Sequence, residues 1–139
     1  MNENLLLSAD ARTTAGVLLL TIVFVEYGGT YLLRVVRGRH PLTEFQRSFA
    51  RAGHAHAGVL VSFALVCQIL ADATDLSGAL ATVARSGVPL AAILMPAGFF
   101  AASAGRGRTQ PNKFIAVLFA GAIMLALGLS SLGIGLLTA

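Results

Sequence analysis

The chain has 139 residues, of which 56% are hydrophobic and only 12% are Asp, Glu, Lys or Arg. A soluble domain of average composition carries about 25% of these charged residues. Charge this sparse, with a mean hydropathy of +0.80, excludes a soluble globular protein and predicts an all-α integral membrane protein with one domain, residues 1–139. The lone cysteine, Cys67, excludes an intrachain disulfide.

Four apolar stretches are each long enough to cross a bilayer, which takes about 20 residues. We therefore predict four transmembrane helices in an up-down-up-down bundle. The expected spans are 14–33, 52–71, 86–105 and 114–137.

The first span, expected to start near Thr13 and Thr14, carries Glu26, the only formal charge within the four stretches. A carboxylate at membrane depth costs about 2.5–3.5 kcal/mol on insertion scales. Ionisable groups inside a membrane are functional candidates by default, so Glu26 is the first candidate site residue. The competing interpretation is a buried carboxylate that only holds two helices in register.

The second span follows a loop in which Pro41 should end any preceding helix and Thr43 could cap the next one. At about 100° per residue, one stripe of this span carries small and polar side chains. The stripe consists of Arg51, His54, Gly58, Ser62 and Leu65. His56 points the opposite way, and should face a neighbouring helix, a second subunit or lipid.

The last two spans contain helix-perturbing and small residues. Pro89 lies in the first turns of its expected span, where proline is tolerated, whereas Pro96 near mid-membrane should bend the helix or free a carbonyl. In the fourth span Gly121, Gly128 and Gly135 recur every seven residues. Such a stripe predicts the packing seam of the bundle, with a dimer interface as the alternative.

Basic residues gather in two of the three loops. Five arginines lie in or beside the first loop, residues 34–51, and three cations lie in or beside the third, residues 106–113. The positive-inside rule then predicts both loops in the cytoplasm, both termini outside, and a multi-pass protein of the cell inner (plasma) membrane. Because these loops are short and flank membrane ends, they favour contact with membrane lipid, including anionic lipid, over nucleic acid.

Several polar residues of the first two spans are expected at similar depths in the membrane. Glu26 lies eight residues before Arg34, about 12 Å, and His54 lies three residues beyond Arg51, about 4 Å, at 1.5 Å per residue. We therefore expect Glu26 to meet His54 or Arg51 in the cytoplasmic half of the membrane. Hydroxyl groups that could support this cluster belong to Tyr27, Thr30 and Tyr31.

Three classes of function are compatible with this cluster. The favoured one is a small-ligand-binding or proton-linked transport protein, working as a homo-oligomer or a membrane-complex subunit, because carboxyl and imidazole groups can pass a proton. The second is a structural or accessory subunit. The third is a redox protein with haem or a transition metal, for which Glu26, His54 and His56 would be the ligands.

The redox class is the least favoured of the three. Two histidines separated by one residue diverge by about 160° on a regular helix and do not easily grip one ion. The chain also lacks a phosphate-binding loop, a GxSxG nucleophile motif and a dinucleotide fingerprint. No cofactor is therefore identified from the sequence, and an enzyme is disfavoured.

Overall fold

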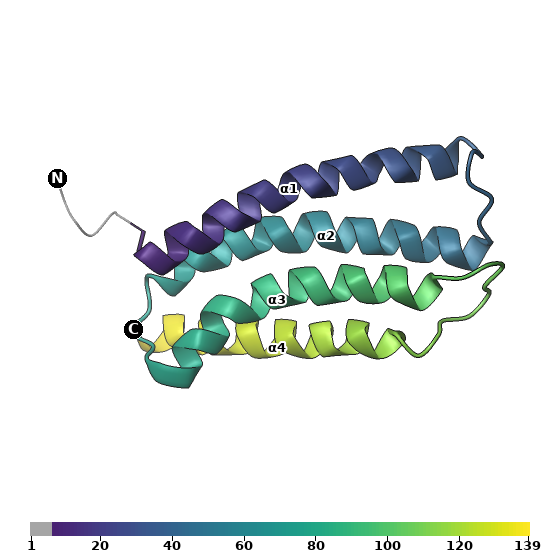
Figure 1. The fold of residues 1–139 in the computed structure, drawn as a ribbon. Coiled ribbons are helices and arrows are strands. Elements are labelled where there is room, and N and C mark those ends of the chain that lie inside the picture. The colour runs from purple at the N-terminus through teal and green to yellow at the C-terminus, as the bar shows by residue number, and fades with distance from the viewer. Residues whose placement is uncertain (1–6) are drawn as a thin grey trace.

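The computed structural model describes residues 7–139 and contains four helices, each long and apolar enough to span a membrane. Their bounds are Ala9–Val36 for α1, Glu44–Ala71 for α2, Gly78–Ser103 for α3 and Ile115–Thr138 for α4. Successive helices run antiparallel (Figure 1). The predicted all-helical chain with four membrane-length helices is confirmed.

The two ends of the helix array differ in charge. Loops 37–43 and 104–114 lie together at one end, here called the basic end, which contains Arg37, Arg39, Arg106, Arg108 and Lys113. Loop 72–77 and the C-terminus lie at the other, here called the terminal end (Figure 1).

Side-chain caps set where α1 and α2 begin. Ser8 accepts a hydrogen bond from the Ala11 N–H at 3.2 Å, so α1 starts at Ala9, about one turn before the expected Thr13–Thr14 start. Thr43 and Gln46 form a capping box that starts α2 at Glu44, as the cap signal in the sequence indicates. Gln46 also donates from Nε2 to the Ser103 and Gly105 carbonyls, at 2.9 and 2.7 Å. The start of α2 is thereby joined to the end of α3.

The glycine stripe of α4 is a packing seam within the chain. A Cβ at Gly128 would lie 2.9 Å from the Gly87 Cα, so the backbones of α3 and α4 meet there without intervening side chains. Gly121 lies against Met95, and Gly135 against Leu76, with comparable closeness. Small residues permit this approach where the surrounding lipid is as apolar as the helix.

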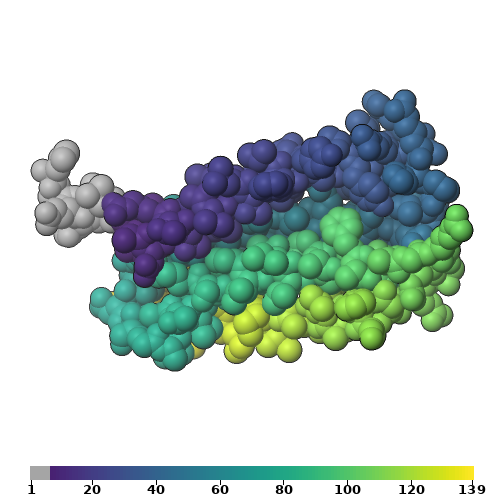
Figure 2. All heavy atoms as spheres, in the orientation of Figure 1, coloured from purple at the N-terminus to yellow at the C-terminus, as the bar shows by residue number. Residues whose placement is uncertain are grey.

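The helices pack in chain order, and α1 is the least enclosed. Contacts join α1 to α2, α2 to α3 and α3 to α4, with a smaller contact between α2 and α4. Figure 1 shows α1 diverging from α2 toward the basic end, and Figure 2 shows a hollow between α1 and α3. Large apolar side chains such as Phe24, 76% exposed, cover the outer face of α1. That face is left for lipid or another protein.

Both prolines lie inside α3, which bends in its first half (Figure 1). Because α3 begins at Gly78, Pro89 is an interior residue rather than one of the first turns. A proline there lacks the N–H that would bond the carbonyl four residues earlier, which belongs to Arg85. The side chain of Gln68, fully buried in α2, donates to that carbonyl at 2.7 Å.

Candidate functional site in the groove between α1 and α2

Glu26 and His54 line one pocket of about 550 Å³ between α1 and α2, here called the Glu26 groove. Glu26 is exposed on the protein surface, and His54 is half-buried. The remaining lining side chains are apolar or small, apart from one hydroxyl. They are Ile22 and Val25 of α1, and Ala55, Gly58, Val59 and Ser62 of α2.

Two glycines of α1 lie beside the imidazole of His54. A Cβ at Gly28 would lie 3.7 Å from Nδ1 of His54, and one at Gly29 would lie 3.6 Å from Cε1. The histidine ring therefore rests against the α1 backbone, within one turn of Glu26. Both distances are ordinary van der Waals separations, so an alanine at either position would pack against the imidazole without displacing it.

Glu26 has no ion-pair partner within residues 7–139, where the salt bridge found joins Arg85 and Asp72. Its helix position, ten residues before the end of α1 at Val36, corresponds to about 15 Å at 1.5 Å per residue. A carboxylate at such a depth in a bilayer must gain a proton or a cationic partner to offset its desolvation. The groove therefore offers an available acid group beside apolar walls.

The other residues expected in the cluster lie elsewhere. Arg51 lines a separate pocket nearer the basic end. Tyr27 is 75% exposed, and Thr30 donates its hydroxyl to the Tyr27 carbonyl at 2.7 Å. Tyr31 lines a third pocket, shared with α2 and α3, and its ring lies 5.6 Å from that of His40. Of the expected set, the structure brings together Glu26 and His54.

His56 belongs to a different contact from His54. Its ring centroid lies 4.9 Å from that of Phe99 on α3, and its Nδ1 lies 2.8 Å from the Ala52 carbonyl oxygen. The two histidines therefore contact different helices, as their helical divergence predicts. Across the described part of the chain, no group of three or more His, Cys, Asp or Glu could hold a metal ion. Glu26, His54 and His56 do not converge on one point.

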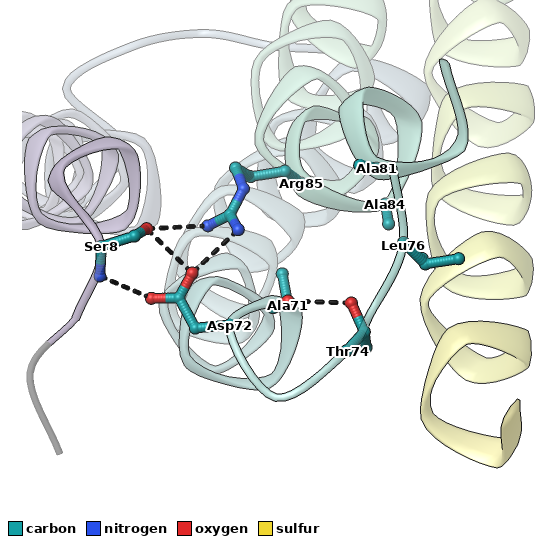
Figure 3. A pocket seen from close by; sticks show the side chains of 8 residues that line it. All are labelled: Ser8, Ala71, Asp72, Thr74, Leu76, Ala81, Ala84 and Arg85. Atoms are coloured by element: carbon teal, nitrogen blue, oxygen red, sulfur yellow. Dashed lines mark hydrogen bonds and ion pairs between the residues drawn. The ribbon is translucent and has the colours of Figure 1, made fainter. Parts of the chain in front are cut away.

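A second polar cluster, not anticipated from the sequence, joins three helices at the terminal end (Figure 3). Asp72 accepts hydrogen bonds from the N–H and hydroxyl of Ser8, both at 2.8 Å, and pairs with Arg85 at 2.8 Å. These residues line a pocket of about 430 Å³. The sequence does contain signals for this cluster. Asp72 and Arg85 carry opposite charges on either side of the short turn before α3, and Ser8 precedes α1.

The electrostatics of this cluster favour the charged form of Asp72. Burial raises the pKa of its carboxyl, but hydrogen bonds from Ser8 and the charge of Arg85 outweigh that effect. The net result is a pKa below its ordinary value of 3.8. Asp72 therefore stays ionised and ties the start of α1 to α2 and α3.

The fold and the groove together define a class: a helical protein with four membrane-length helices, in which a carboxylate without an ion-pair partner among residues 7–139 lies beside a histidine between two helices. Comparisons of the chain with known protein families, curated proteins and solved structures found no match. The functional assignment therefore depends on the chemistry of the groove.

Proposed function

We propose that this protein binds a small amphipathic organic cation at Glu26, in competition with a proton, and that this exchange serves proton-linked transport. The observation that carries the proposal is the Glu26 carboxylate, which lines a mostly apolar groove and has no ion-pair partner within residues 7–139. Such a site stabilises a ligand with one positive charge and an apolar body. Protonation of Glu26 neutralises the site and releases the cation.

The apolar walls and His54 have separate roles in this proposal. Ile22, Val25 and Val59 supply apolar surface for the body of the ligand, worth about 25 cal/mol per Å² removed from water. His54 lies beside the carboxylate, and its ring nitrogens can hydrogen-bond the carboxyl group or the ligand. The proton that Glu26 gives up when a cation binds is released to the solvent.

Orientation and assembly form part of the same proposal. By the positive-inside rule, the basic end faces the cytoplasm and both termini face the outside of the inner (plasma) membrane. The Glu26 groove opens on the surface of a single chain, and four spans are few for a carrier. A second copy, or another subunit of a membrane complex, would enclose the groove and complete a path.

Binding of tetraphenylphosphonium, a permanent cation with an apolar body, tests the proposal directly. We expect isothermal titration calorimetry in detergent to show binding by the wild type that weakens as the pH is lowered. Glu26→Gln should abolish this binding. The matched control is Glu44→Gln, which removes the same charge at the exposed start of α2 and should retain it. Equal binding by the Glu26→Gln and Glu44→Gln variants would refute the site.

The accessory-subunit class is favoured by one observation, the packing of the His54 ring beside Gly28 and Gly29 of α1. In that case the polar residues only fix the approach of α1 to α2. Glu26→Gln and His54→Ala would then lower the thermal unfolding temperature, and the wild type would bind no tetraphenylphosphonium.

The proposed orientation has its own test. Alkaline phosphatase, which is active only outside the cytoplasm, should be active when fused after Ala139 and inactive when fused within loop 104–114. The reverse pattern would contradict the orientation without affecting the binding site.

A further inference from the structure

A second pocket, of about 340 Å³, lies between α1 and α2 at the basic end. Its α1 wall is apolar and its α2 wall is polar, and it is here called the arginine pocket. The wall residues are Leu32, Val35 and Val36 of α1, and Glu44, Arg47, Ser48 and Arg51 of α2.

The polar wall has the groups that recognise a phosphate ester. Arg47 and Arg51 are four residues apart on α2 and so lie on one face, with the Ser48 hydroxyl beside them. Guanidinium groups match phosphate oxygens with paired hydrogen bonds. Neither arginine forms an ion pair within residues 7–139. Glu44 also lines the pocket, which leaves the wall with one net positive charge.

The apolar wall and the position of the pocket select the kind of phosphate. Val36 is 78% exposed at the end of α1, and the half-buried Leu32 lies one turn before it, whereas Val35 is buried at the back of the pocket. The pocket thus combines a cationic α2 wall with an apolar α1 wall, and the α1 wall leads toward the membrane-spanning part of that helix. This arrangement matches an amphiphile rather than a free ion.

We propose that the arginine pocket binds an anionic phospholipid, with its phosphodiester on Arg47 and Arg51 and an acyl chain against Leu32 and Val36. The site is separate from the Glu26 groove, because the contact of His54 with α1 lies between the two. The basic loops are expected to attract anionic lipid in general. The arginine pocket is a specific place where one lipid headgroup would bind. The proposal does not depend on cation binding at Glu26.

The test is native mass spectrometry of detergent-purified protein titrated with phosphatidylglycerol or phosphatidylcholine. We expect the wild type to retain phosphatidylglycerol in preference to phosphatidylcholine. Arg47→Gln with Arg51→Gln should weaken retention by about thirtyfold. The matched control, Arg106→Gln with Lys113→Gln, removes the same charge from loop 104–114 and should weaken it by less than about threefold.

Several outcomes would overturn the proposal. One is equal weakening by the two double variants, which would mean attraction by overall charge alone. Another is displacement of the lipid by millimolar inorganic phosphate, which would mean a site for free phosphate. Arg51→Lys keeps the charge but loses the guanidinium fork, so it should give intermediate retention in a folded protein. Circular dichroism verifies the fold of every variant, and wild-type retention by folded Arg51→Lys would contradict the paired contact.

Discussion

The side-chain amide of Gln68 donates a hydrogen bond to the main-chain carbonyl of Arg85 at 2.7 Å. That carbonyl has no helical partner, because the residue four positions later is Pro89. An unpaired carbonyl in a bilayer is costly, so the bend of α3 and the buried glutamine of α2 form one unit. Gln68 thereby joins two helices at the point where one of them is broken.

A double-mutant cycle tests this unit. Gln68→Leu leaves the Arg85 carbonyl unpaired, which costs about 1–3 kcal/mol. The loss should fall toward the lower limit, since Oε1 of Gln68 is itself buried without a partner in the described structure. Pro89→Ala restores a helical N–H for the same carbonyl. Gln68→Leu should therefore cost less in the Pro89→Ala background when unfolding is followed by circular dichroism, and strictly additive effects would contradict the pairing.

The Asp72 cluster predicts an acid-sensitive contribution to stability. The folded-state pKa of Asp72 is lowered below 3.8, so its contribution is complete above that value and is lost as the pH falls through the folded-state pKa. Thermal unfolding followed between about pH 5 and about pH 3 should show a smaller acid loss in Asp72→Asn than in the wild type. Asp75→Asn, in the same loop but outside this ion pair, should follow the wild type. A steep acid loss in Asp72→Asn would contradict the assignment.

The α3–α4 seam predicts opposite effects for two glycines of α4. A methyl group at Gly128 would meet the Gly87 backbone at 2.9 Å, so Gly128→Ala should separate the helices and cost about 1–3 kcal/mol. At Gly133 nothing lies within 4 Å, and alanine there should be neutral or stabilise by up to about 1 kcal/mol. Thermal unfolding of the two single variants compares them. Equal effects of the two substitutions on the unfolding temperature would contradict the seam, because helix propensity alone favours alanine over glycine at both positions.

Much of the fold follows from local sequence properties. Apolar length predicts four spans because a bilayer admits few other structures, and the seven-residue glycine repeat predicts the seam because small residues permit close approach. The capping box at Thr43 is equally local. The sequence predicted too late a start for α1 and placed Pro89 in the first turns of α3. Both predictions were wrong because hydropathy marks only the apolar part of a helix, and these helices extend beyond it.

The site was less predictable, because it depends on which helix lies against each face of α2. Helical periodicity correctly separates His54 from His56, since it depends only on one helix. It does not reveal that α1 meets His54 through Gly28 and Gly29, or that α3 presents Phe99 to His56. Depth alone grouped Arg51 with Glu26, but Arg51 lies in another pocket. These contacts depend on how each helix is rotated about its axis and how far it diverges from its neighbour. Neither property can be read from the sequence of a single helix.

The most direct test of cation–proton exchange at Glu26 is proton release on ligand binding. Tetraphenylphosphonium would be added to detergent-solubilised protein in weak buffer with a pH-indicator dye, at a pH where the carboxyl is partly protonated. We expect the wild type to release up to about one proton per bound cation, and Glu26→Gln to release none. Binding without proton release by the wild type, or equal release by Glu26→Gln, would contradict exchange at this carboxylate.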